Sequence, residues 1–149
     1  MTRAVLLDSG PLGLLTAPPR RRDAQACLGW LAGLIAAKVR IVVPEITDYE
    51  LRRELIRAGK AASIHRLDAL AQATEYVPIT TAAMRRAAEL WAQARQRGQA
   101  TAGDNTIDAD MILIAQALTL GEPNTVIATT NVGHLARFIS AELWQNISP

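Results

Sequence analysis

Short apolar segments that read as strands alternate with long helical patterns along this chain. The strand-like segments are residues 5–7, 40–43, 76–77 and 125–128. Strands that alternate with helices are typical of a parallel sheet covered by helices on both faces. We therefore expect an α/β protein with three layers, α/β/α, around a central parallel sheet of four to five strands.

The helical patterns end where glycine permits a left-handed cap. We predict helices over residues 23–38, 45–58, 61–73, 81–97 and 107–120. Gly59, Gly98 and Gly121 each follow one of these helices closely, as a left-handed C-terminal cap requires. The third and fourth helices are rich in alanine, and we expect them to form a hairpin-like pair.

The composition favours one domain with one core. The chain has 149 residues, of which 50% are hydrophobic and 20% charged, which is enough for a single core, so we expect a single domain over residues 1–149. No apolar stretch approaches the roughly 20 residues needed to cross a bilayer, and we expect a soluble, cytoplasmic protein with no membrane partner. Cys27, the only cysteine, excludes a disulfide framework and is expected to be a core residue.

Carboxylates follow the predicted strands or open the predicted helices. Asp8 follows the first strand. The second strand is followed by Glu45, Asp48, Glu50 and Glu54, and the last long helix begins with Asp104, Asp108 and Asp110. The carboxyl ends of parallel strands lie at one edge of a sheet, where ligands bind in open α/β folds. An oxygen-only cluster without cysteine or histidine suits Mg²⁺ or Mn²⁺ better than zinc.

Each carboxylate also has a purely structural explanation. Asp8 precedes Ser-Gly-Pro and is suited to a turn that leads into a second apolar stretch, and acids in the first turn of a helix favour its positive end. Glu50 and Glu54 are a like-charge pair one turn apart, and periodicity does not choose the ligand among the acids of this helix. Asp108 and Asp110 point to different sides of their helix, which would allow one to bind and the other to cap.

In combination these segments resemble a known family. LLDSGPL, VVPEITDYELRREL, IDADMILIAQAL and VIATTNVGHLARF are similar to the four motif blocks of PIN domains, particularly those of the VapC-like toxins. The resemblance implies that the acids of the site are Asp8, Glu50 and Asp110, with Asn131 as a fourth catalytic residue. It further implies Asp108 as an additional or water-mediated metal ligand. The chain departs from the pattern at Asn131 and His134, where many relatives carry acids.

The resemblance also implies a function. We expect a metal-dependent endoribonuclease that uses Mg²⁺ or Mn²⁺ to activate water, and that acts as the toxin of a toxin and antitoxin pair. Ser9 and Thr129 are expected to orient the carboxylates or the phosphate, and Arg20, Arg21 and Arg22 to contact flanking RNA phosphates. A cognate antitoxin and a second copy of the chain are the expected protein partners.

Asn131 leaves an alternative open. Because it replaces an acid, the chain is also compatible with a catalytically degenerate PIN module that binds nucleic acid or a partner protein. Asp8, Glu50 and Asp110 together oppose this alternative, since a degenerate site has no use for three acids at one sheet edge.

Overall fold

The sheet has five parallel strands in a computed structural model that describes residues 3–98, 104–133 and 135–149, with the side chains of α6 described from Asp108 onward. The spatial order of the strands is β3-β2-β1-β4-β5. In chain order they are β1 (Ala4–Leu7), β2 (Arg40–Pro44), β3 (Glu75–Val77), β4 (Thr125–Thr129) and β5 (Ala141–Leu143). The predicted α/β class with a parallel sheet is confirmed.

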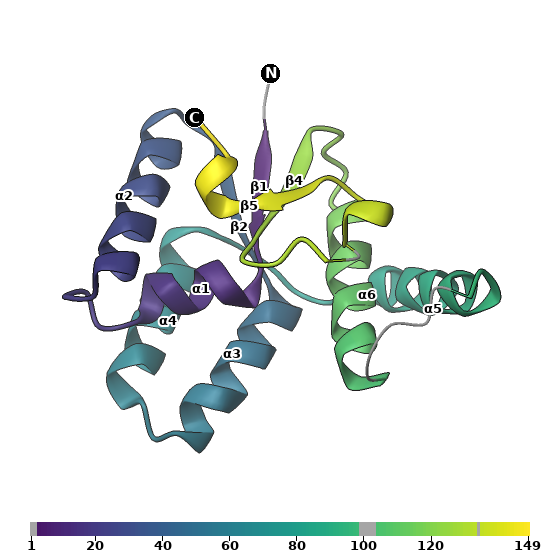
Figure 1. Cartoon of the computed structure of the whole chain (residues 1–149), viewed down its shortest axis with the longest axis horizontal. Helices are drawn as coiled ribbons and strands as arrows, with labels where there is room; N and C mark the ends of the chain where they lie inside the picture. Colours follow the sequence, from purple (N-terminus) through teal and green to yellow (C-terminus); the bar gives the residue numbers. More distant parts are fainter. Residues whose placement is uncertain (1–2, 99–103, 134) are drawn as a thin grey trace.

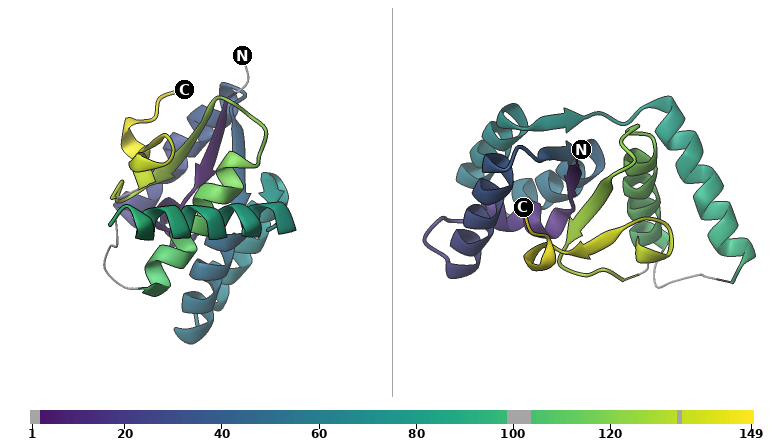
Figure 2. Two further views of the ribbon diagram at one scale, coloured as in Figure 1. Left: turned by 90° about the vertical axis from the view of Figure 1, so that its right-hand side faces the viewer. Right: turned by 90° about the horizontal axis from the view of Figure 1, so that it is seen from above.

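Helices cover both faces of the sheet and complete the three layers (Figures 1 and 2). Helices α1, α2 and α4 pack on one face, α5 and α6 pack on the other, and α3 extends from the carboxyl end of β2. The helices are α1 (Ser9–Thr16), α2 (Arg22–Ala36), α3 (Glu45–Arg57), α4 (Ala61–Ala73), α5 (Thr81–Gln96) and α6 (Asp104–Leu118). Short 3-10 helices at Leu135–Arg137 and Trp144–Asn146 flank β5.

The burial of the central strand on both faces explains why its apolar run is uninterrupted. All four residues of β1 are fully buried. Ala4 and Leu6 pack against the α5 and α6 layer, whereas Val5 and Leu7 pack against the α1, α2 and α4 layer. Alternate residues of a strand point to opposite faces, so a strand covered on both sides needs an apolar residue at every position.

The segment after β1 differs from the predicted turn. Asp8 is the N-cap of α1, and its side chain accepts a hydrogen bond from the Ser9 backbone N–H. Gly10 and Pro11, whose residue types favour a turn, lie inside the first turn of this helix. Proline is tolerated there because its missing N–H would have no partner within the helix.

A glycine allows the first turn of α1 to approach the end of β4. A Cβ added to Gly10 would lie 2.7 Å from Thr130 Cγ2, far inside normal contact. Gly10 therefore permits the two segments that carry Asp8 and Thr129 to come together at the carboxyl edge of the sheet.

Other predicted elements are confirmed with shifted ends, and one prediction is wrong. Gly59, Gly98 and Gly121 have the left-handed φ values of 67°, 67° and 83° expected of helix caps. The hairpin-like pair does not form: α4 packs against α3 and α1, and α5 packs against α6. Strand β3 separates α4 from α5 and carries the chain between the two helical layers (Figure 2).

Cys27 lies in the core, as the sequence predicts, close to a pair of packed tryptophan rings. Cys27 is fully buried, and burial raises the pKa of its thiol to about 12, so it remains protonated at neutral pH. Trp30 and Trp144 pack edge to face with ring centroids 5.6 Å apart. Within the described part of the chain, no helix combines the length and apolar character needed to cross a membrane.

Candidate metal centre

Strand register places Asp8 beside Thr129 at the carboxyl edge of the sheet. Leu7 of β1 pairs with Ala128 of β4, so the next residue on each strand continues the register. The Thr129 hydroxyl lies 2.7 Å from Asp8 Oδ2, to which it donates, and it accepts the Asn131 N–H at 3.1 Å. With the Ser9 N–H on Oδ1 at 2.7 Å, both oxygens of Asp8 are held in a fixed orientation.

Glu50 on α3 lies within the electrostatic reach of two other acids. Burial first, and then the charges of Asp8 and Asp110, raise the pKa of the Glu50 carboxyl to about 7, whereas Arg53 lowers it. A carboxyl held among like charges is unfavourable in its ionised form unless a cation is present. The three acids that the resemblance implied are therefore electrostatically coupled, although they come from β1, α3 and α6.

We expect Glu50→Gln to stabilise the metal-free protein at neutral pH. The pKa of Glu50 rises on folding from its usual 4.5 to about 7, so its contribution is fully present below pH 4.5 and is lost as the pH rises toward 7. The neutral amide of the variant avoids this loss. Thermal unfolding in EDTA between pH 4.5 and 8 should show a stability gain for Glu50→Gln that grows with pH.

Glu54→Gln is the matched control, because Glu54 lies one turn further along α3 and pairs with Arg57 at 2.8 Å near the surface. Its stability should follow the wild-type pH profile. A Glu50→Gln protein that is less stable than wild type in EDTA at pH 8 would contradict the assigned coupling of the three acids.

The other acids of α3 have structural partners, as their helical positions indicated. Glu45 Oε1 accepts the Ile79 N–H at 2.7 Å and fixes the segment that follows β3. Asp48, 9% exposed, accepts hydrogen bonds from Arg52 and from the Tyr76 hydroxyl, both at 2.9 Å. These contacts leave Glu50 as the acid of α3 that faces Asp8 and Asp110.

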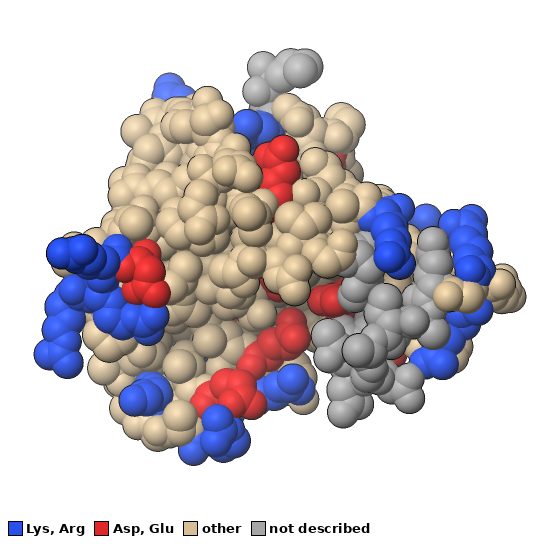
Figure 3. All heavy atoms as spheres, viewed as in Figure 1, with Lys and Arg blue, Asp and Glu red and all other residues tan. Residues whose placement is uncertain are grey.

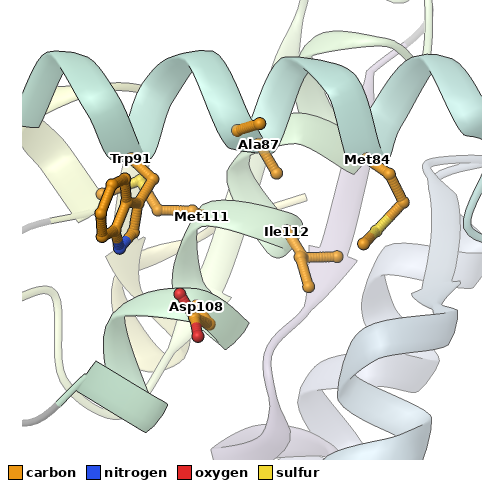
Figure 4. Close-up of a pocket in the computed structure, with 7 residues that line it drawn as sticks. Met84, Ala87, Trp91, Asp108, Met111 and Ile112 are labelled. Atoms are coloured by element: carbon orange, nitrogen blue, oxygen red, sulfur yellow. The ribbon is translucent and has the colours of Figure 1, made fainter.

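Asp108 and Asp110 occupy different surroundings on α6. The charge of Asp110 acts on Glu50, whereas Asp108 lines a hollow of about 350 Å³ between α5 and α6 together with Met84, Trp91 and other apolar residues. Figure 4 shows Asp108 on α6 below Trp91. The structure thus places Asp108 in a mainly apolar hollow, while its neighbour two residues on interacts with the acidic site.

The remaining predicted residues are distributed around this site. Thr129 is 1% exposed, and its hydroxyl donates to Asp8. Ser9 contributes its backbone N–H to Asp8, and Asn131 is exposed at the end of β4. Arg20 and Arg21, between α1 and α2, and Arg22, the first residue of α2, are exposed, and His134 lies outside the described residues.

Gln116 is a positioning residue that the sequence reading missed. Its side chain, 1% exposed, accepts the Ile46 N–H at 3.2 Å and donates to the Val77 carbonyl at 2.9 Å. It therefore joins α6, the helix of Asp110, to the start of α3, the helix of Glu50, and to β3. A polar side chain within the apolar run MILIAQAL was the available signal.

The carboxylate oxygens of the three acids are suitable ligands for a hard divalent cation. The acids offer only oxygen ligands, and burial together with the charges of Asp8 and Asp110 raises the pKa of Glu50, so that a bound cation would favour its ionised form. Among the described residues, no three His, Cys, Asp or Glu side chains already lie close enough together to hold a metal ion. Asp8, Glu50 and Asp110 would therefore have to move closer together to coordinate a metal ion. The charge of the cation would offset the repulsion among the three carboxylates.

We expect Thr129→Val to lower activity without unfolding the protein. Valine keeps the shape of threonine and removes the hydroxyl that holds Asp8 Oδ2. Loss of a hydrogen bond that orients a metal ligand typically costs roughly 10- to 100-fold in affinity or activity. The measurement is kcat and the Mg²⁺ concentration for half-maximal rate, with Thr129→Ser as the rescue variant. Equal impairment of the serine variant would show that Thr129 acts through packing alone.

A parallel α/β/α fold with three coupled acids at the carboxyl edge of its central strands defines the class of this protein. The PIN domain family model matches residues 6–137. The chain therefore belongs to the PIN domain family, whose members are generally nucleases that use divalent metals. A comparison with curated protein sequences gives no match.

Solved structures similar to this chain share its fold over nearly the whole length. FitAcB from Neisseria gonorrhoeae has a TM-score of 0.70 at 20% identity, covering 96% of this chain and 99% of that one. VapBC2 from Rickettsia felis bound to a promoter DNA fragment has a TM-score of 0.67 at 18% identity, covering 95% and 98%. DNA-bound VapBC from Salmonella typhimurium has a TM-score of 0.62 at 19% identity, covering 97% and 99%.

Proposed function

We propose that this protein is a Mg²⁺- or Mn²⁺-dependent endoribonuclease that acts as the toxin of a toxin and antitoxin pair. The observation that carries the proposal is the electrostatic coupling of Glu50 to Asp8 and Asp110 at the carboxyl edge of the sheet. Membership of the PIN family supports nuclease chemistry, since this family generally consists of nucleases.

Asp8, Glu50 and Asp110 would hold the cation in this function. The bound cation supplies Lewis-acid activation of water and charge stabilisation at the phosphate, so no protein nucleophile is required. Thr129 and the Ser9 N–H orient the two oxygens of Asp8. Asn131, exposed beside this pair, offers an amide to a water molecule or to the phosphate. Asp108 is not needed in this set.

The test is cleavage of end-labelled single-stranded RNA and of DNA of the same sequence by the purified protein. RNA cleavage should appear with Mg²⁺ or Mn²⁺ and stop with EDTA, whereas Ca²⁺, which tolerates a looser geometry, should support it poorly. Cleavage that persists in EDTA would contradict the metal requirement. DNA cleavage at the same rate would contradict the RNA assignment.

The degenerate PIN module remains the second candidate, favoured by Asn131 in place of an acid. It differs from the nuclease in one measurable way. A degenerate module should bind RNA or a partner with no response to Mg²⁺, and should cleave nothing under any divalent cation.

An antitoxin is the proposed protein partner. VapBC and FitAB structures, to which this chain is similar, are toxin and antitoxin complexes. A guanidinium from such a partner would suit the acidic site, because it forms charge-assisted hydrogen bonds with carboxylates. Antitoxin binding should then weaken as Mg²⁺ is raised at constant ionic strength. We also propose that the protein is cytoplasmic and forms a homodimer. Analytical ultracentrifugation would test the association of two chains.

A further inference from the structure

A second charged site lies at the opposite end of α1 from Asp8. A hollow of about 400 Å³ opens between the end of α1, the end of α3 and the start of α4. Three cationic side chains line it: Arg21 from the segment before α2, and Lys60 and Arg66 from the start of α4. None of these segments is adjacent in sequence to the acids of the proposed metal centre.

Two of these cations have no carboxylate partner among the described residues. Arg21 pairs with Asp23 at 2.6 Å, but no ion pair involves Lys60 or Arg66. Arg66 is held in place because its Nε donates to the Thr16 carbonyl at 2.8 Å and its Nη2 donates to the Ser63 hydroxyl at 3.2 Å. A fixed guanidinium with a free ammonium beside it is a preorganised arrangement for an anion.

The backbone at this hollow also favours negative charge. Helix α4 begins at Ala61, and its N-cap residue Lys60 makes no side-chain capping bond. The first N–H groups of a helix carry partial positive charge and lack partners within the helix. The Ser63 side chain is 6% exposed and accepts from Arg66, and no acceptor for its own hydroxyl hydrogen is found among the described residues. A phosphate group would satisfy all of these donors together.

The hollow lies on the same pair of helices that carries two of the acids. Helices α1 and α3 pack side by side, with Gly13 facing Leu51, and Asp8 caps the other end of α1. Because α1 has 8 residues, the hollow lies about 12 Å along its axis from Asp8. Figure 3 shows Lys and Arg side chains gathered over the segment between α1 and α2, and Asp and Glu side chains running over α3 toward α6.

We propose that this hollow is a phosphate subsite in which Lys60 and Arg66, assisted by Arg21, bind an RNA backbone phosphate a few nucleotides from the bond that is cleaved. The proposal rests on the proposed nuclease function and adds to it a residue set outside the metal centre. An RNA strand fits the hollow better than an isolated anion does, because its evenly spaced phosphates can reach both this subsite and the cation site.

The test compares Lys60→Gln with Arg57→Gln, a matched control whose cation lies nearby but is paired with Glu54. Binding of a labelled single-stranded RNA of about twelve nucleotides is followed by fluorescence anisotropy in EDTA, over a range of salt concentrations. Lys60→Gln should weaken binding about fivefold and lower the slope of log K against log salt by about 0.7, as loss of one phosphate contact predicts. Arg57→Gln should leave the slope unchanged.

A second measurement separates this subsite from the metal centre. With Mg²⁺ present, Lys60→Gln should raise KM for the longer RNA and leave kcat, and the cleavage of a dinucleotide, unchanged. Arg66→Lys keeps the charge but not the planar fork, and it should weaken binding less than Arg66→Gln. Thermal unfolding of each variant identifies any loss of the Thr16 and Ser63 contacts.

Failure of this inference is distinguishable from failure of the proposed function. If the wild-type protein cleaves RNA but Lys60→Gln and Arg57→Gln bind it alike, the subsite is overturned and the nuclease remains. A Lys60→Gln variant that loses affinity for polyglutamate and not for RNA overturns it in favour of an acidic protein segment. A wild-type protein that neither binds nor cleaves RNA overturns the function on which the inference rests.

Discussion

Asp8→Asn should abolish metal-dependent RNA cleavage while the fold is retained, with a loss of at least about 10³-fold in kcat. The variant keeps the size of the side chain and its role as the N-cap of α1, since asparagine also accepts the Ser9 N–H. It removes the charge that the cation requires. The measurement is single-turnover cleavage, with circular dichroism and the unfolding temperature as checks on the fold.

Glu89→Gln is the control for Asp8→Asn. Glu89 is an exposed acid on α5 and pairs with Arg86 at 3.2 Å, outside both the metal centre and the phosphate subsite. Its variant should cleave RNA within about twofold of the wild-type rate, because surface substitutions of this kind have small effects. Undiminished cleavage by purified Asp8→Asn protein would contradict the assignment of the site.

Gln116→Leu should produce the largest loss of stability among the substitutions considered. Leucine fits the buried space but leaves the Ile46 N–H and the Val77 carbonyl without the partners that Gln116 supplies. A buried polar group left unsatisfied costs about 1–3 kcal/mol, so we expect a loss of about 2–4 kcal/mol in the free energy of unfolding. Urea denaturation monitored by fluorescence measures it.

Gln72→Leu provides the comparison, because Gln72 is exposed on α4 and makes no such bridge. It should change stability by no more than about 0.5 kcal/mol. The Gln116→Leu protein should also cleave RNA more slowly under conditions where it is folded, since α3 and α6 lose the contact that sets Glu50 against Asp110. Wild-type stability in Gln116→Leu would contradict the bridging role.

The central strands and the first acid follow from the sequence for a simple physical reason. A strand buried on both faces must be apolar throughout, so the run that ends at Leu7 identified β1 and placed Asp8 at the carboxyl edge. The helix that Asp8 caps could be predicted less well. Helix α1 was missed because Gly10 and Pro11 favour turns, although both are tolerated within a first helical turn.

The choice of acid on α3 depends on contacts between distant segments. Periodicity left the acids of this helix equivalent, whereas Tyr76 and Ile79, which follow α4 in sequence, engage Asp48 and Glu45. The resemblance to PIN domains indicates Glu50 independently of these contacts. The bridge made by Gln116, and the hollow that Arg21 shares with Lys60 and Arg66, likewise arise only when separate segments pack together.

The most direct test of the metal centre is Mn²⁺ binding followed by electron paramagnetic resonance, because free Mn²⁺ gives a signal that is lost on binding. The wild-type protein should bind Mn²⁺ saturably and in competition with Mg²⁺. Asp8→Asn and Glu50→Gln should lose this binding, and Glu54→Gln should keep it. Saturable binding of equal affinity in all four proteins would contradict a centre built from Asp8, Glu50 and Asp110.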